Sequence, residues 1–233
     1  MARVAFVIAS HSDLLARGVV ELAEQMAPDV RFWAAGGTDE GGIGTSYDRI
    51  EAGVEAALEE VGDEEGAGVV VLADLGSATM TVESVLDFAD EPDRLVFVDA
   101  PLVEATVAAS VRAQLGDALG GVVAAARGAW KPLSAEPEDA PLHPEPVALD
   151  DEALVATALV ADPVGLHARP AALVARVAGG FDAEVLVDGA DAGSVLELMA
   201  LGATKGQTVE LRASGPDAAK ALKAVAEAIE TID

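Results

Sequence analysis

The sequence Gly-Leu-His-Ala-Arg-Pro-Ala at residues 165–171 places a histidine, an arginine and a proline close together. The apolar-rich residues 154–164 before it indicate a strand and a turn, and the residues after it are typical of a helix. His167 should therefore lie where the helix begins. Pro170 should lie in the first turn, where a missing N–H has no cost.

This position suits anion chemistry. Free backbone N–H groups at a helix N-terminus attract anions, and the guanidinium of Arg169 can pair with phosphate oxygens. An imidazole that titrates near neutrality beside such a site can carry a phosphoryl group transiently. A histidine at residue 167 that only caps the helix or packs against it is the alternative interpretation.

A second histidine, His11, directly follows the first predicted strand. Asp74 and Ser77 follow another predicted strand, and Thr45 lies in a glycine-rich loop, residues 36–46, after a third. The loop lacks the Gly-Lys-Ser/Thr ending of a nucleotide-binding P-loop. Because ligands gather at the carboxyl ends of parallel strands, we expect these side chains to lie near one another. A histidine with no function at an exposed strand end is the alternative.

The elements that must position these residues differ between the two parts of the chain. In the first part, predicted strands at residues 4–9, 30–34, 69–72 and 95–98 alternate with predicted helices at residues 13–27, 47–61, 78–89 and 101–126. This alternation predicts an α/β fold with a doubly wound, mostly parallel sheet. Ser12 or Asp13 can cap the first helix, and Pro28 closes it.

The last part of the chain mixes strands and helices in another order. A strand is followed by a helix at 169–178, a strand at 183–187, a turn at 188–189, a short helix at 195–200, a strand at 208–213 and a helix at 217–231. This order predicts an α+β open-faced sandwich with helices on one side of an antiparallel sheet.

The predicted boundaries give a domain at residues 1–128, a linker at 129–149 and a domain at 150–233. The linker has five prolines, several acids and no periodicity, so we expect it to be extended. His143 lies in it, between Leu142 and Pro144, and is given no role.

The composition excludes several classes of function. The net charge is −27, and without a basic stripe we expect no nucleic-acid partner. Both parts are acidic: residues 1–128 carry 7 basic and 23 acidic side chains, and residues 150–233 carry 6 and 14. There is no cysteine, so neither a disulfide nor a thiolate metal site can form. The apolar run at the N-terminus is too short for a signal peptide or a membrane span, so we expect a cytoplasmic protein without a membrane partner.

Residues 165–171 closely resemble the active-site motif of HPr, the histidine phosphocarrier of the sugar phosphotransferase system. The resemblance covers residues 150–233, including 193–203 and Lys205-Gly206. It implies that His167 takes a phosphoryl group from enzyme I and that Arg169 steadies it. A serine at the position of Ser194 can be a regulatory phosphorylation site in that family. Ser194 to Glu197 is also a capping box, and that structural role is enough to explain the serine.

Residues 1–128 resemble the phosphotransfer subunits of bacterial dihydroxyacetone kinases, whose leading domain is similar to the mannose-type enzyme IIA. Five blocks in the same order carry the resemblance: Ser10-His11-Ser12, Gly36-Gly37, Ile43-Gly44-Thr45, residues 74–78 and residues 100–106. The Ala-Pro-Leu-Val-Glu block at 100–104 separates this family from sugar-transport enzyme IIA domains. The resemblance implies that Asp74 orients the His11 imidazole and that Ser77 and Thr45 donate hydrogen bonds to phosphoryl oxygens.

Together the two resemblances imply a relay from enzyme I to His167, then to His11, then to ADP bound in a separate kinase subunit that phosphorylates dihydroxyacetone. The chain itself then needs no metal or organic cofactor. The mannose-type resemblance suggests a homodimer through the first domain. Because the sequence ends at Asp233, we expect enzyme I to be a separate protein. The alternatives are a sugar-transport component of the phosphotransferase system and a regulatory module that signals by its phosphorylation state. The sequence leaves open which ring nitrogens are phosphorylated.

Overall fold

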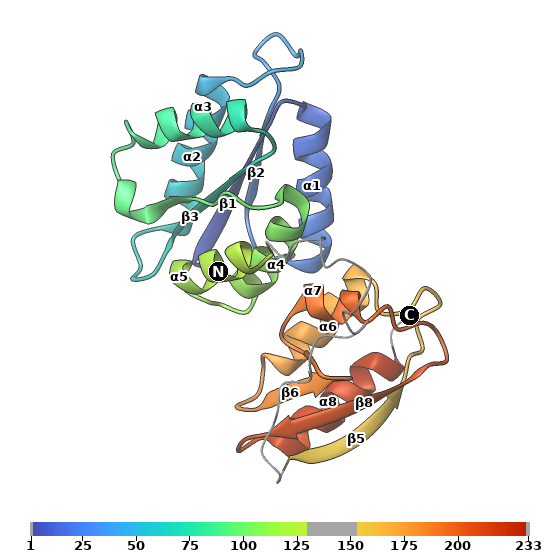
Figure 1. Ribbon diagram of the computed structural model, residues 1–233. Helices are drawn as coiled ribbons and strands as arrows, with labels where there is room; N and C mark the ends of the chain where they lie inside the picture. The colour runs from blue at the N-terminus through green and yellow to red at the C-terminus, as the bar shows by residue number, and fades with distance from the viewer. Residues whose placement is uncertain (1, 130–152, 232–233) are drawn as a thin grey trace, which may run out of the picture. The chain divides into compact units, whose positions relative to one another are not determined.

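The chain divides into two compact units, residues 1–131 and 132–233, in a computed structural model that describes residues 2–129 and 153–231 (Figure 1). All but the first residue of the predicted linker lies outside the described residues, as does His143. None of the helices in the described ranges has the length and apolar character that crossing a membrane requires.

The first unit is built on four parallel strands in the order β2-β1-β3-β4. They are β1 (Val4–Ser10), β2 (Phe32–Gly36), β3 (Gly68–Ala73) and β4 (Leu95–Phe97). Every residue of β1 is buried, as expected for a central parallel strand covered on both faces. The predicted parallel sheet is confirmed, although β2 lies two residues later than the sequence predicted.

Helices cover both faces of this sheet, which makes the fold doubly wound (Figure 1). The helices are α1 (Asp13–Met26), α2 (Tyr47–Val61), α3 (Gly76–Leu86), α4 (Leu102–Gln114) and α5 (Leu119–Gly128), with a short 3-10 helix, η1 (Pro92–Arg94), before β4. α2 and α3 pack together over one face, where Ile50, Val54 and Val82 share a core with β1 and β3. α1 and α4 pack over the other face.

The helical stretch predicted at residues 101–126 is wrong in one respect, because it consists of two helices. Gly116, with φ of +89°, lies just after the end of α4 and turns the chain in a left-handed conformation that favours glycine. Asp117 follows and forms an ion pair with Arg112, 2.7 Å away. The break places α5 against α4 and β3.

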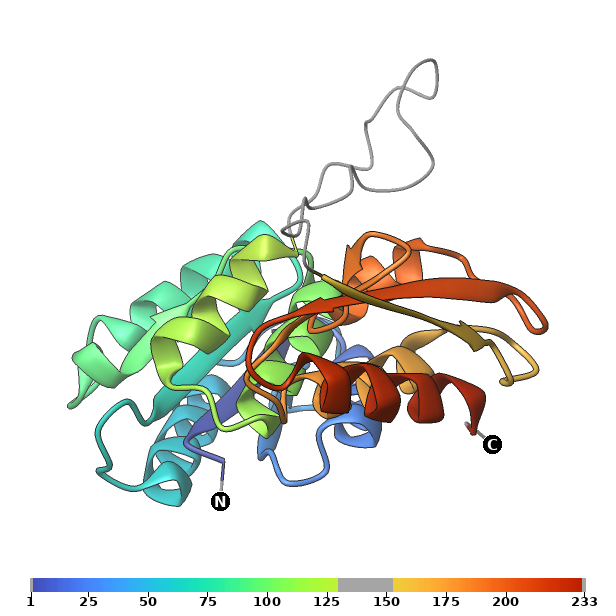
Figure 2. The same cartoon turned by 90° about the horizontal axis from the view of Figure 1, so that it is seen from below.

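The second unit is an antiparallel sheet in the order β5-β8-β6-β7. Its elements are β5 (Leu154–Leu159), α6 (Ala168–Ala178), β6 (Glu184–Val187), β7 (Ala190–Asp191), α7 (Val195–Ala200), β8 (Thr208–Ser214) and α8 (Ala218–Glu230). α8 lies along one face of the sheet, and α6 packs against α8 and α7 (Figure 2). The predicted open-faced sandwich is confirmed.

One strand of this sheet, β7, was not predicted. The chain turns at Asp188 and Gly189, whose φ values of +46° and +86° are those of a two-residue hairpin, so two residues after the turn pair back onto β6. The turn itself agrees with the prediction. A two-residue strand leaves too short a pattern to be seen in the sequence.

Candidate functional site

The first candidate site forms where two neighbouring strands end. β1 ends at Ser10 and β3 at Ala73, and the parallel register pairs Ala9 with Ala73. His11 and Asp74 therefore leave adjacent strands at the same edge of the sheet. This is the convergence that the positions of these residues in the sequence predicted.

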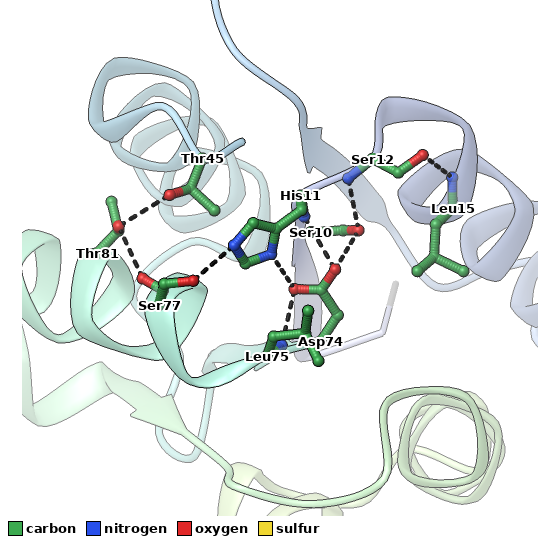
Figure 3. A network of polar contacts seen from close by, with 9 residues as sticks. All are labelled: Ser10, His11, Ser12, Leu15, Thr45, Asp74, Leu75, Ser77 and Thr81. Atoms are coloured by element: carbon green, nitrogen blue, oxygen red, sulfur yellow. Dashed lines mark hydrogen bonds and ion pairs between the residues drawn. The ribbon is translucent and has the colours of Figure 1, made fainter. Parts of the chain in front are cut away.

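The carboxylate of Asp74 holds the His11 ring and backbone together (Figure 3). Its Oδ1 lies 2.9 Å from Nδ1 of His11 and accepts the N–H of Leu75 at 2.8 Å. Its Oδ2 accepts the His11 backbone N–H at 2.9 Å and the Ser10 hydroxyl at 2.8 Å. With so many hydrogen bonds on one carboxylate, the ring has little freedom to turn.

These hydrogen bonds also decide the charge of Asp74. Burial raises the pKa of the carboxyl, but the hydrogen bonds from the His11 ring, the His11 N–H and the Ser10 hydroxyl outweigh it. The pKa of Asp74 therefore lies below its ordinary value. An ionised carboxylate only accepts hydrogen bonds, so its contact with the ring places the proton on Nδ1 and leaves a lone pair on Nε2.

Nε2 of His11 faces Ser77, whose Oγ lies 2.6 Å away. Ser77 reaches the ring because α3 begins at Gly76, two residues before the predicted start, so that its first turn lies beside the histidine. Thr45 is placed differently from Ser77. Its Oγ1 lies 3.1 Å from Oγ1 of Thr81, which in turn donates to the backbone carbonyl of Ser77 (Figure 3). Thr45 is thus linked to the ring only through Thr81 and Ser77.

The start of α3 is open to an anion. No side chain caps it, its first turn has no acidic residue, and within the described residues no acceptor meets the N–H groups of Gly76 and Ser77. α1 and α2 differ from it, because Ser12 and Ser46 cap them and an aspartate lies in each first turn. A helix N-terminus with free donors beside Nε2 of His11 can hold the oxygens of a phosphoryl group.

The glycine-rich loop is held close to this site. Gly44 donates its N–H to the carbonyl of His11 at 2.9 Å, which brings Thr45 to the edge of the site. Gly36, at the end of β2, lies so close to α1 that a Cβ there would be 2.6 Å from the carbonyl oxygen of Ser12. A side chain at position 36 would therefore displace the start of α1, which begins two residues after His11.

The second candidate site lies at the start of α6, where His167 is the last residue before the helix. The preceding turn is pressed against the segment after α7. Leu166 donates its N–H to the carbonyl of Ala203 at 2.9 Å, and Gly165, with φ of +90°, has no room for a Cβ beside the same oxygen. The prediction that His167 lies where the helix begins is confirmed, and Pro170 lies in the first turn of α6.

The surroundings of His167 combine an anion site with one carboxylate. The first turn of α6 has no acid and no side-chain cap, and the N–H groups of Ala168 and Arg169 meet no acceptor within residues 2–129 and 153–231. The Arg169 side chain is exposed and forms no ion pair within those ranges. Nε2 of His167 lies 3.4 Å from Oδ1 of Asp162. A shallow depression of about 250 Å³ adjoins the ring, lined by Val164, Met199 and Gly202.

Ser194 caps α7, because its Oγ accepts the N–H of Glu197 at 3.4 Å. This is one half of the predicted capping box, and the Ser194 N–H donates to the carbonyl of Asp191 at 3.0 Å. The carboxylate of Glu197 accepts the N–H of Asp191 at 3.1 Å. The cap is a structural role for Ser194, and a regulatory role stays a prediction.

Three residues of these sites were not singled out from the sequence. Ser10, which is fully buried, supports Asp74, and Thr81 supports Ser77. Asp162 lies within the apolar-rich residues 154–164, a pattern that gives it no role of its own. A signal existed for Ser10 in the Ser-His-Ser block, but Thr81 and Asp162 come into place only through the helix start and the turn, which the sequence does not define to the residue.

Comparisons with known proteins match the two units of the chain to two different families. Residues 5–123 match the family model described as the PTS system fructose IIA component, and residues 155–231 match that of the PTS HPr component phosphorylation site. The chain is 35% identical over 111 residues to the PEP-dependent dihydroxyacetone kinase 1 phosphoryl donor subunit DhaM of Listeria innocua, covering 48% of this chain and 82% of the relative.

Two longer relatives match more of the chain. The phosphoryl donor subunit DhaM of Pantoea ananatis is 33% identical over 231 residues, which is 94% of this chain and 48% of the relative. That of Klebsiella michiganensis is 33% identical over 192 residues, 78% of this chain and 40% of the relative. The chain thus spans less than half the length of these two relatives.

Proposed function

Because this chain belongs to the family of phosphoryl donor subunits of PEP-dependent dihydroxyacetone kinases, we propose that it is a phosphoryl relay with two stations. Enzyme I, charged by phosphoenolpyruvate, phosphorylates His167, and His167 passes the group to His11. His11 then phosphorylates ADP held in the nucleotide-binding subunit of the kinase, whose partner subunit binds dihydroxyacetone. The relay works in the cytoplasm.

The observation that carries this proposal is the arrangement of Asp74, His11 and Ser77 in one line of contacts. Asp74 keeps the proton on Nδ1, so the Nε2 lone pair can attack phosphorus. The new N–P bond forms as the donor's N–P bond breaks, and the ring takes a positive charge that Asp74 stabilises. The Ser77 hydroxyl and the free N–H groups at the start of α3 can hold the phosphoryl oxygens.

At the His167 site, the hydrogen-bond donors come from the first residues of α6. The N–H groups of Ala168 and Arg169 and the guanidinium of Arg169 can bind the oxygens of a phosphoryl group on His167. At the His11 site, Thr45 acts indirectly, through Thr81 and Ser77, rather than as a direct donor to the phosphoryl oxygens. Both stations supply positioning and anion stabilisation, which is what phosphoryl transfer chiefly requires.

Exposed apolar side chains beside His11 support transfer to and from proteins. Leu14, Ile43 and Leu75 are more than half exposed. Leu75 directly follows Asp74, Ile43 directly precedes Gly44, and Leu14 lies in the first turn of α1, three residues after His11. Apolar surface around a reacting group favours docking of a protein partner. We propose that the partners of the chain are enzyme I, which acts at His167, and the kinase subunits, which accept the group from His11, and that the chain forms a homodimer through its first unit.

Intact-mass analysis tests the relay. The protein is mixed with phosphoenolpyruvate and enzyme I and kept at alkaline pH to preserve phosphohistidine. We expect two added phosphoryl groups in the wild type, none in His167→Ala, and one in His11→Ala. Normal labelling of His11 in the His167→Ala protein would contradict the order of the relay.

Adding the ADP-loaded kinase subunit and dihydroxyacetone then tests the acceptor. Both groups should leave as dihydroxyacetone phosphate appears. A group that stays on His167 would favour the sugar-transport alternative. A group that reaches His11 and never passes to nucleotide would favour the regulatory module.

A further inference from the structure

Asp162 is a buried carboxylate beside His167 that the relay as described does not use. It lies in the turn between β5 and α6, and its side chain is 8% exposed. Its Oδ1 accepts the N–H of Val164 at 2.8 Å and lies 3.4 Å from Nε2 of His167. The His167 side chain is 40% exposed, so the ring is open to solvent while its Nε2 lies near this carboxylate.

Turn formation alone does not account for this carboxylate. Asp191 makes the same local contact, because its Oδ1 accepts the N–H of Gly193 two residues on, at 2.8 Å. Asp191 is exposed, and no histidine pairs with it within the described residues. Such a turn needs only an acceptor oxygen, which an asparagine or a serine also supplies. The negative charge of Asp162, buried beside an imidazole, is therefore an additional feature.

We propose that Asp162 is a positioning residue for His167, which holds the proton on Nε2 and stabilises the positive ring that forms on phosphorylation. This inference rests on the proposed function of His167. The lone pair of Nδ1 forms the N–P bond, and the electron pair of the donor's broken N–P bond returns to the donor's nitrogen. The Nε2 proton stays on the ring, which becomes a cation paired with Asp162. The charge disappears when the phosphoryl group leaves.

The other charges near the ring do not provide this stabilisation. Arg169, on α6, is a cation and opposes a second positive charge close by. The segment that faces the turn, residues 199–203, is Met-Ala-Leu-Gly-Ala and has no ionisable side chain. Among the described contacts of the ring, Asp162 is the group that favours its cationic form.

The test compares Asp162→Asn with the matched control Asp191→Asn, both in the full chain and in the His11→Ala background, so that only His167 is labelled. Replacing a buried aspartate that orients a catalytic histidine lowers kcat about 10⁴-fold in a serine protease. Because His167 is partly exposed and the contact is longer, we expect about a tenfold lower kcat for phosphorylation by enzyme I. The KM for enzyme I should not change, since the Asp162 side chain is 8% exposed and offers little surface to a partner. Asp191→Asn should equal the background protein in both constants.

A spectroscopic measurement distinguishes an effect of Asp162 on the protonation of the His167 ring from an effect on the structure of the turn. In phosphorylated protein with ¹⁵N-labelled histidine at pH 8, the Nε2 signal of His167 should be that of a protonated nitrogen. In Asp162→Asn it should become that of an unprotonated one, with the Asp191→Asn spectrum unchanged. If Asp162→Asn does not fold, Asp162→Ser, whose hydroxyl can accept the Val164 N–H, takes its place.

The experiment distinguishes a failure of the proposed role of Asp162 from a failure of the proposed relay. If the His11→Ala protein is never labelled at His167, the proposed function is wrong. If it is labelled, and Asp162→Asn matches Asp191→Asn in kcat and in the Nε2 signal, the role of Asp162 is overturned while the relay stands.

Discussion

The His11 ring is held at both nitrogens, by Asp74 on one side and Ser77 on the other. Asp74 is itself held in place by its neighbours. The buried Ser10 hydroxyl donates to it and accepts the N–H of Ser12, so that one serine links the carboxylate to the start of α1. Supporting hydrogen bonds of this kind hold a reactive side chain close to the geometry that its chemistry needs.

The lowered pKa of Asp74 predicts how the stability of the first unit depends on pH. A carboxyl whose pKa is lower in the folded state than the ordinary 3.8 stabilises the fold fully above that value, and the stabilisation is lost as the pH falls through the lowered value. We expect Asp74→Asn to be less stable than the wild type at pH 7 and to lose less stability between pH 5 and pH 3. Urea unfolding of the full chain, followed through amide signals of β1, measures both.

Asp90→Asn is the matched control, because Asp90 is exposed and takes no part in the described hydrogen bonds or ion pairs. Its stability curve should run parallel to that of the wild type. If the Asp74→Asn protein and the wild type lose the same stability between pH 5 and pH 3, the hydrogen bonds on Asp74 do not stabilise its charge.

At the scale of helices and turns, the starts of α3 and α6 decide which side chains reach the two histidines. The sequence predicted that His11, Asp74 and Ser77 meet, because strand ends are visible as the ends of apolar runs. It did not predict the start of α3, because Leu75 precedes that helix and no Ser, Thr, Asp or Asn caps it there. The contacts of Thr81, and of Thr45 through it, depend on that start. Asp162 could not be predicted because its burial depends on a turn stacked against residues from a distant part of the chain.

Gly165 shows how closely this turn is packed. Its φ is +90°, and a Cβ would lie 2.2 Å from the carbonyl oxygen of Ala203. We expect Gly165→Ala to destabilise the second unit by about 3 kcal/mol or more, since backbone strain and a clash with a backbone atom add together. Urea unfolding of the full chain, followed through amide signals of β8, measures the loss.

Gly206→Ala provides the control for strain alone. Gly206 has φ of +82°, and an added Cβ would meet nothing within 4 Å, so we expect a loss of about 1 kcal/mol. If the two variants lose the same amount, the contact between the Gly165 turn and Ala203 does not restrict the site.

For the whole molecule, the proposed relay would require two negatively charged units to react with each other. Residues 1–128 have a net charge of −16 and residues 150–233 one of −8. Like charges slow an encounter, and dissolved salt screens them over a distance of about 10 Å at 0.1 M. Joining the units in one chain raises their mutual concentration, which offsets the repulsion.

Transfer between separate chains should therefore be faster in salt. We expect phosphorylated His11→Ala protein to pass its group to the His11 site of His167→Ala protein several-fold faster at 0.15 M than at 0.01 M ionic strength. Quenched samples and intact mass give the rate. Sucrose of equal osmolality is the control and should not raise the rate. A rate that falls with salt would mean that local opposite charges, rather than net charge, guide the encounter.

The carboxylates lie on opposite nitrogens of the two rings, Nδ1 in His11 and Nε2 in His167. Because the nitrogen that faces no carboxylate also differs, we expect different regioisomers of phosphohistidine at the two sites, the 3-phospho form at His11 and the 1-phospho form at His167. Antibodies selective for each isomer can tell these forms apart. A pair of immunoblots on the unmodified protein would then report how full each station is during turnover, with no substitution in the chain.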